Sequence, residues 1–381
     1  MAYFDNAATT YPKPEIVYSF MDEFYRKYGG NAGRGDYYIA SSSKALIEET
    51  RILLKELLHC TAKEVIFTPT ATIALNMIIQ GVIDKGVRNV YISPFEHNAV
   101  TRTLHQFEKT GTITIRELAV TEELEYDLKR IRYQFEETHP DFVIVSHASN
   151  VIGLIAPVDE IFNTAKQYSA VTLVDMAQTA GVVDLDVGRE TIDFAVFAGH
   201  KSLMGPTGIS GFIMKPDFML PAILFGGTGF DSSNQDMPNS IPERYEMGTS
   251  NIVGIAGLNA ALKWIRKETI PHLFSVEAER RDSLIKILKR YPFLHIIGNN
   301  PDRRYVGIVS VVIDGISSDS AGGVFSERNI SVRTGLQCAP KAHQFIRTFP
   351  AGTIRFSVNS LTTNKDLEEL RVALDDIEAN L

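Results

Sequence analysis

The stretch Asp193-Phe-Ala-Val-Phe-Ala-Gly-His200-Lys201 has the pattern of a buried strand that ends in small residues and then presents a histidine and a lysine. Further β-rich runs alternate with helical stretches between about residues 64 and 215, and they lie at 65–68, 90–93, 142–145, 171–174 and 211–214. This alternation predicts an α/β fold with a mainly parallel sheet covered by helices. The carboxyl ends of such strands open onto a cleft, and we expect His200 and Lys201 to lie there.

The flanking regions complete the predicted architecture. Leu46, Thr50, Leu53 and Leu57 recur at helical spacing with charged residues between them, which describes an amphipathic helix. Residues 226–243 are rich in Gly, Ser, Asn, Asp and Pro, and we expect an active-site loop there. A smaller C-terminal α+β domain is predicted with a helix at 252–266, strands at 306–312, 330–333 and 353–358, and a final helix with Asn364 as its N-cap.

Composition limits the partners that we expect. The 381 residues are 44% hydrophobic and 22% charged, as in ordinary globular proteins, and the formal net charge is -8. Nucleic-acid surfaces need clustered Lys and Arg, so we expect a small-molecule partner and no nucleic acid. No apolar run approaches the ~18 residues that span a bilayer, and Met1 to Thr10 lacks signal-peptide features. We therefore expect a cytoplasmic protein without a membrane segment. The two cysteines do not form metal-ligand spacing, so no metal is expected.

Lys201 and Asp175 are the residues whose chemistry is most specific. Partial burial lowers the pKa of a lysine and frees its amine to condense with an aldehyde. A solvated lysine beside a loop histidine is the structural alternative. Asp175 ends another apolar strand at the same predicted edge. A carboxylate there can bind a protonated pyridine nitrogen, with Gln178 near the ring substituents. The alternative for Asp175 is a helix N-cap.

Other motifs keep the order and spacing of one family. They are Tyr3-Phe-Asp-Asn-Ala-Ala-Thr-Thr10, Glu96-His97, Ser146-His147-Ala-Ser-Asn150-Val-Ile-Gly153, Arg244-Tyr-Glu-Met-Gly-Thr-Ser-Asn251 and Arg333-Thr-Gly-Leu-Gln-Cys338. With them the chain resembles the class V aminotransferases and, within that family, the Suf-type cysteine desulfurases. The resemblance implies the pyridoxal 5'-phosphate (PLP)-dependent transferase fold type I, with a mainly parallel seven-stranded sheet. It also implies a large domain at 16–254 and a small domain at 1–15 and 255–381.

The resemblance assigns the residues around the cofactor ring. Lys201 would hold PLP as a Schiff base, and Asp175 would face the ring nitrogen. His97 would stack on the ring and shuttle protons, while Asn150 and Gln178 would bond around the phenolic oxygen.

The resemblance likewise assigns the residues around the cofactor phosphate. The phosphate would lie at a helix start, near the backbone amides of Ala71 and Thr72 and the Thr72 hydroxyl, where the helix dipole favours an anion. His200 would add a side-chain contact. Thr249 would reach the phosphate of a neighbouring subunit, so a homodimer is implied. Its alternative is an ordinary turn residue.

The resemblance also assigns substrate residues. Arg355 would bind the substrate carboxylate through its guanidinium fork, and its alternative is a surface arginine in a salt bridge. Asn31 and Arg34 match a substrate-binding loop, although Gly33 replaces a commoner histidine. Cys338 would be the nucleophile that takes sulfur from the substrate, and its alternative is a buried, inert cysteine.

Some positions depart from the family pattern. Thr70-Ala71-Thr72 replaces Gly-Thr-Thr at the phosphate loop, Ala198 replaces a serine, and Met176 replaces a glycine. We therefore expect looser cofactor binding. Leu336 and Gln337 replace paired histidines before the cysteine.

The predicted activity converts L-cysteine to L-alanine. Lys201 would take the Cα proton, and the sulfur would be held as a persulfide on Cys338 before it passes to an acceptor protein. The alternatives are another class V PLP enzyme, namely a selenocysteine lyase, a cysteine or cystine C–S lyase, an aminotransferase or an epimerase. A catalytically idle PLP-binding scaffold protein is the alternative from a different class.

Overall fold

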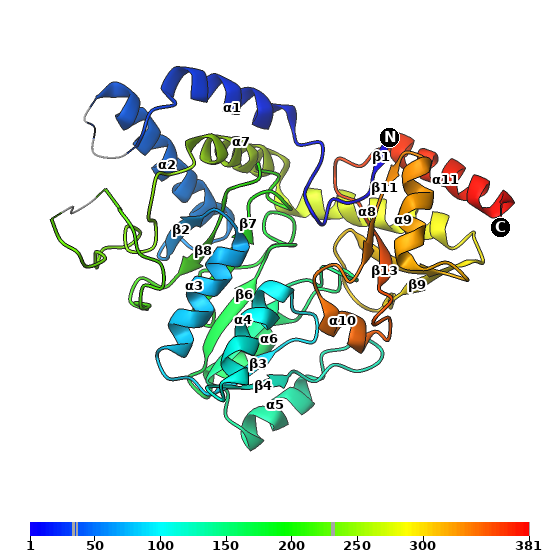
Figure 1. Ribbon diagram of the computed structural model, residues 1–381, viewed down its shortest axis with the longest axis horizontal. Helices are drawn as coiled ribbons and strands as arrows, with labels where there is room; N and C mark the ends of the chain where they lie inside the picture. Colours follow the sequence, from blue (N-terminus) through cyan, green and yellow to red (C-terminus); the bar gives the residue numbers. More distant parts are fainter. Residues whose placement is uncertain (33–34, 36, 230–232, 381) are drawn as a thin grey trace.

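The computed structural model describes residues 1–32, 35, 37–229 and 233–380. Within them, seven strands form the central sheet in the order β2-β8-β7-β6-β5-β3-β4 (Figure 1). Their bounds are β2 Glu64–Thr68, β3 Asn89–Ile92, β4 Thr114–Glu117, β5 Phe142–Ser146, β6 Val171–Asp175, β7 Phe194–Ala198 and β8 Ser210–Met214. Strand β8 runs antiparallel to β2 and β7, and the other pairs are parallel. The predicted mainly parallel sheet is confirmed.

Strand β4 is absent from the sequence prediction. Its four residues read Thr-Ile-Arg-Glu, and they are exposed or only partly buried at the edge of the sheet. An edge strand that buries one side poorly needs no apolar run, so hydrophobic pattern alone does not reveal it.

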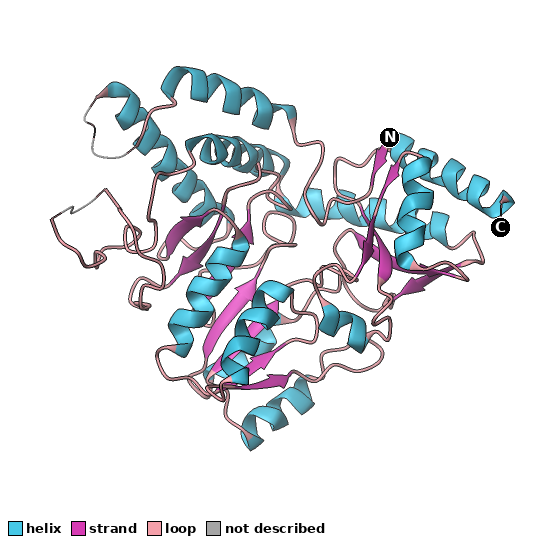
Figure 2. Cartoon of the chain, in the orientation of Figure 1, coloured by secondary structure: helices cyan, strands magenta, loops and turns pink. Residues whose placement is uncertain are grey.

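Helices cover both faces of the sheet (Figure 2). Their bounds are α1 Glu15–Tyr28, α2 Tyr38–Leu57, α3 Ala71–Ile83, α4 Asn98–Lys109, α5 Leu128–Glu137, α6 Val158–Lys166 and α7 Ile252–Glu268. Val143 and Val145 of β5 join the apolar core beneath α2, α5, α6 and α7, whereas Phe142 and Ile144 join the core beneath α3 and α4. Successive side chains of a strand point to opposite faces, which explains why the central strands read as continuous apolar runs.

The C-terminal region forms a second, smaller sheet. Its strands are β9 Leu294–Ile297, β10 Ile308–Ile313, β12 Arg333–Gly335 and β13 Thr353–Ser357, and they pair antiparallel in the order β12-β13-β10-β9. Strand β1 (Ala2–Tyr3) pairs in parallel with β11 (Ile330–Ser331), so the N-terminus lies beside the C-terminal strands (Figure 1). The remaining helices are α8 Ile270–Leu288, α9 Ser318–Glu327, α10 Pro340–Phe345 and α11 Asn364–Ala379.

One predicted helix start is wrong. The N-cap of α11 is Thr363, not Asn364, which is the first helical residue. Thr363 Oγ1 accepts the Asp366 N–H, and Asp366 accepts the Thr363 N–H, so the two residues form a capping box. A Thr-x-x-Asp spacing was the signal for this cap.

The predicted domain division stays a proposal. Its boundary after residue 254 falls inside α7, which packs on α1 and α2. The predicted loop at 226–243 contains no helix or strand in its described residues, 226–229 and 233–243. In the described part of the chain, no helix is both long and apolar enough to cross a membrane.

Candidate active site

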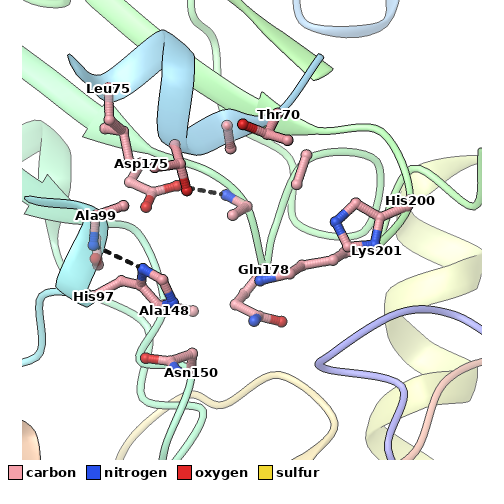
Figure 3. Close-up of a pocket in the computed structure, with 15 residues that line it drawn as sticks. Thr70, Leu75, His97, Ala99, Ala148, Asn150, Asp175, Gln178, His200 and Lys201 are labelled. Atoms are coloured by element: carbon pink, nitrogen blue, oxygen red, sulfur yellow. Dashed lines mark hydrogen bonds between the residues drawn. The ribbon is translucent and has the colours of Figure 1, made fainter. Parts of the chain in front are cut away.

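A cavity of about 220 Å³ opens at the carboxyl ends of the central strands (Figure 3). Its polar lining brings together most of the predicted cofactor residues: Ala71, Thr72, His97, Asn150, Asp175, Gln178, His200 and Lys201. Asp175 is the last residue of β6, and Lys201 follows the end of β7. Neighbouring parallel strands therefore deliver both groups to one edge.

The backbone of the lysine turn is held by the N-terminal segment. Thr10 donates its N–H to His200 O at 3.0 Å and its hydroxyl to Lys201 O at 2.8 Å. Lys13 Nζ also donates to His200 O at 3.3 Å. Withdrawal from water lowers the pKa of the Lys201 amine to about 8, and the nearby Asp175 carboxylate opposes this shift. The Lys201 amine is thus prepared to act as a nucleophile or a base near neutral pH.

Asp175 is buried behind the cavity. Its Oδ1 accepts the Ala177 N–H at 2.9 Å. Burial raises the pKa of the carboxyl, while this hydrogen bond and the Lys201 charge lower it. Gln178 lies one turn further, and its Nε2 donates to Ala7 O at 3.0 Å. The side-chain amide nitrogen of glutamine carries two N–H groups, so Gln178 keeps one donor for the cavity.

His97 enters the cavity from the start of α4, on the side away from Lys201 in this view (Figure 3). Its Nδ1 accepts the Ala99 N–H at 3.0 Å, so the proton of the neutral ring is on Nε2. Burial and the Lys201 charge lower the pKa of His97 to about 4. The ring is therefore neutral at physiological pH.

Glu96 precedes His97 and links the loop after β3 to the end of β5, a role that the sequence did not predict. The carboxylate is fully buried and accepts the Ser93 hydroxyl at 2.7 Å, the Ser146 N–H at 2.6 Å and the Ser146 hydroxyl at 2.8 Å. Burial raises its pKa to about 7. The Glu96-His97 pair in the sequence was the available signal for this residue.

The start of α3 lines the cavity. Thr70 is the N-cap, and its hydroxyl accepts the Ile73 N–H at 3.2 Å, whereas the Ala71 and Thr72 amides lie in the first helical turn, where such groups lack intrahelical partners. His200 Nδ1 is buried and has no hydrogen-bond partner in the described residues. Burial lowers the pKa of His200 to about 4. A helix start and an unsatisfied imidazole nitrogen fit the phosphate of the expected cofactor.

Cys338 is exposed in the turn between β12 and α10, whereas its neighbours Gln337 and Ala339 are buried. Gln337 and Cys338 have φ values of 39° and 58°, in the left-handed region. Asn150 Nδ2 donates to Gln337 O at 2.6 Å, and the Asn98 N–H donates to Cys338 O at 2.7 Å. These two hydrogen bonds dock the turn beside His97.

A buried hydrogen-bond network anchors the side chain of Gln337, the residue before Cys338. The sequence did not predict this network. Gln337 Nε2 donates to Thr353 O at 2.9 Å, and Gln337 Oε1 accepts from His343 Nε2 at 2.8 Å. His343 Nδ1 accepts the Thr348 hydroxyl at 2.7 Å, and burial lowers the His343 pKa to about 4. The departure of Gln337 from the family histidine was the only sequence signal.

Of the other predicted residues, those that the structure describes lie outside the cavity lining. Arg355 is buried beside it, where its guanidinium contacts Asp5 and Asn150 O. Thr249 is exposed and lines a separate apolar hollow of about 270 Å³ with Phe67. Asn31 is exposed, and Arg34 falls outside the described residues. None of the described residues of the 226–243 loop lines the cavity.

The family model for aminotransferase class-V matches residues 2–370. The chain belongs to the class-V aminotransferases. A probable cysteine desulfurase of Pyrococcus abyssi is 28% identical over 100% of this chain and 94% of its own length. One from Haemophilus influenzae is 30% identical over 98% of this chain and 85% of its own length.

Solved structures resemble this class-V aminotransferase over its whole length. The apo structure of a cysteine desulfurase from Thermococcus onnurineus NA1 superposes with a TM-score of 0.91 at 26% identity, covering 100% of this chain and 95% of that one. The shared architecture confirms the predicted family and its α/β fold.

Proposed function

We propose that this chain is a PLP-dependent cysteine desulfurase, which converts L-cysteine to L-alanine and keeps the sulfur on Cys338. The observation that carries this proposal is the docking of the Cys338 loop onto Asn98 and Asn150, at the cavity that contains Lys201. An aminotransferase or an epimerase needs no thiol at this position. The names of the relatives support the same activity.

The cavity residues would hold the cofactor by its ends and its ring. The α3 amides of Ala71 and Thr72 and the His200 imidazole would bind the phosphate, and Asp175 would pair with the ring nitrogen. When bound, PLP supplies an aldehyde for the Lys201 amine and a protonated ring that withdraws electrons from the substrate carbon. A raised carboxyl pKa is compatible with this pairing, because the ring cation would compensate the buried charge of Asp175.

Lys201 and His97 would move protons. The Lys201 amine, with its lowered pKa, would take the Cα proton, and His97 would offer the proton on Nε2. Cys338 Sγ, as a thiolate, would attack the substrate sulfur. A sulfur–sulfur bond forms, the Cβ–S bond breaks, and its electron pair goes to the carbon skeleton, which takes up a proton and leaves as alanine. The exposed position of Cys338 then gives an acceptor protein access to the sulfur.

The proposal includes a cytoplasmic homodimer in which Thr249 reaches the partner's cofactor phosphate. Thr249 is exposed, and the hollow beside it is mostly apolar. Glu246, three residues before Thr249, anchors this part of the chain. It forms an ion pair with the largely buried Arg51 at 2.6 Å and accepts the Phe67 N–H at 2.6 Å. An exposed Thr249 on an anchored segment, beside an apolar hollow, supports a contact with a second subunit of the homodimer.

The test is turnover by the purified, PLP-loaded protein. We expect a visible absorption band that shifts when L-cysteine is added, with alanine and transferable sulfur formed in equal amounts when a reductant is present. Lys201→Ala should lose both the band and the turnover. Alanine formation without Lys201, or pyruvate and ammonia in place of alanine, would exclude the proposed reaction.

A further inference from the structure

The guanidinium of Arg355 is already committed in this structure. Its Nη2 donates to Asp5 Oδ1 at 2.8 Å, and its Nη1 donates to Asn150 O at 2.8 Å. The side chain is 3% exposed, and Nε is buried without a partner in the part of the chain that the structure describes. A bidentate carboxylate takes two neighbouring N–H groups of the fork, and Nη1 and Nη2 each already donate to a resident group, so binding across this pair of nitrogens has to displace one of them.

Asp5 is the group that can be replaced. Asn150 O belongs to the backbone, and the Asn150 side chain is tied to the Cys338 loop. The Asp5 carboxylate is 18% exposed and is the same chemical group as the one that a substrate amino acid presents. The backbone on either side of Asp5 is fixed, because Ser357 N donates to Phe4 O at 2.7 Å and Ala7 N donates to Ser357 Oγ at 2.9 Å. With the backbone held on both sides, the movable part of Asp5 is its side chain, whose rotation would release Arg355.

Arg333 is a second cation near Asp5, and it can pair more closely with the displaced carboxylate. Asp5 Oδ2 is 3.8 Å from Arg333 Nη1, and Arg333 is 46% exposed. Arg333 and Arg355 are opposite each other in the pairing of β12 with β13, so their spacing is set by the sheet. An exchange of partners keeps the buried Arg355 charge paired before and after substrate enters, which avoids the cost of an unpaired buried charge.

We propose that Asp5 is a carboxylate placeholder, which occupies Arg355 until the carboxylate of the amino-acid substrate displaces it onto Arg333. This inference rests on the proposed function, since it takes Arg355 as the substrate-carboxylate site. Asp5 is a positioning residue: it competes with the substrate carboxylate for Arg355 and so lowers the affinity of the site for a monocarboxylic amino acid.

The test is calorimetric binding of L-alanine to the PLP-loaded protein. Asp5→Asn keeps the size of the side chain and removes the competing charge, so we expect L-alanine to bind about five- to tenfold more tightly. The KM for L-cysteine should fall by a similar factor, with kcat within about twofold. Asp376→Asn, which breaks the pair with Arg328 on the surface of the C-terminal region, is the matched control and should leave L-alanine binding unchanged.

Arg333→Gln provides the second arm. It removes the receiving cation, so L-alanine binding should weaken in the otherwise unaltered protein. In the Asp5→Asn background the same change should have little effect, because no displaced charge remains to be received. Unchanged or weaker L-alanine binding by Asp5→Asn, or an equal effect of Arg333→Gln in both backgrounds, would overturn the placeholder role. A wild-type protein that binds L-alanine but does not convert L-cysteine would instead overturn the proposed activity.

Discussion

Asn150 Nδ2 donates a 2.6 Å hydrogen bond to Gln337 O, which ties the end of the large sheet to the residue before Cys338. The same asparagine accepts from Arg355 through its backbone oxygen. Asn150 thus joins three parts of the proposed reaction: the cofactor cavity, the substrate arginine and the thiol loop. The position of the thiol depends on contacts from two regions that are far apart in sequence.

Replacement of Cys338 by serine should abolish sulfur transfer. The thiolate is the proposed acceptor of the substrate sulfur, and a hydroxyl cannot replace it. We expect alanine formation to fall by at least about a hundredfold, while the absorption band of bound PLP is retained. Cys60→Ser is the control, because Cys60 is buried and burial raises its pKa to about 12. Persulfide should be detected by mass spectrometry on Cys338 alone, and full activity of Cys338→Ser would refute the persulfide route.

The rate of PLP uptake should follow the ionisation of Lys201. Burial lowers the pKa of this amine to about 8, and only the neutral amine attacks an aldehyde. The neutral fraction grows as the pH rises through the pKa, so we expect the uptake rate of cofactor-free protein to reach half of its maximum near pH 8 and to level off above about pH 9. Stopped-flow absorbance measures this rate. An increase that continues towards pH 10 would indicate an amine that burial has not shifted.

Substitution of His97 by glutamine should lower kcat about a hundredfold, the usual size of a lost proton-transfer group. The wild-type profile should show no inflection from His97 between pH 6 and 7, because its pKa is lowered to about 4 and the ring is already neutral there. His105→Gln, on the exposed face of the same helix, is the control. Equal activities of the two variants would remove His97 from the mechanism.

A serine at position 198 should tighten PLP binding. Ala198 lines the cavity with His200, and the family resemblance implies a serine at this position. A new hydrogen bond to a charged phosphate is worth about 1.5–3 kcal/mol, so we expect Ala198→Ser to lower the Kd for PLP by about tenfold or more. Fluorescence titration of the cofactor-free protein measures the change. Pyridoxal without its phosphate should bind both proteins equally, and an equal gain for pyridoxal would contradict a phosphate contact.

Loss of the Gln337 amide should destabilise the thiol loop. Gln337→Met keeps the shape but leaves the buried Thr353 O and His343 Nε2 without this partner, which should cost about 1–3 kcal/mol in the free energy of unfolding. Urea unfolding measures this cost. Gln344→Met, at an exposed position of α10, should change stability by less than about 0.5 kcal/mol. Equal costs for the two variants would show that the network contributes nothing.

Much of the fold could be predicted because central strands have a strong signature. Residues 142–145 and Phe194–Ala198 are buried on both faces of the sheet, and they are apolar at every position. The edge strand Thr114–Glu117 lacked that pattern and was missed. The final helix was found, but its start was misplaced by one residue because the reciprocal Thr363–Asp366 capping was overlooked.

The sequence alone determined the local chemistry: a lysine and an aspartate at strand ends, a helix start suited to phosphate, and a cysteine in a family motif. It also determined the large sheet, since periodicity and burial are properties of neighbouring residues. Only the tertiary structure decided which distant groups meet, such as Asp5 with Arg355 and Asn150 with Gln337. Those pairs join residues that are 350 and 187 positions apart, and hydrogen bonds depend on distances of a few ångströms that sequence spacing does not encode.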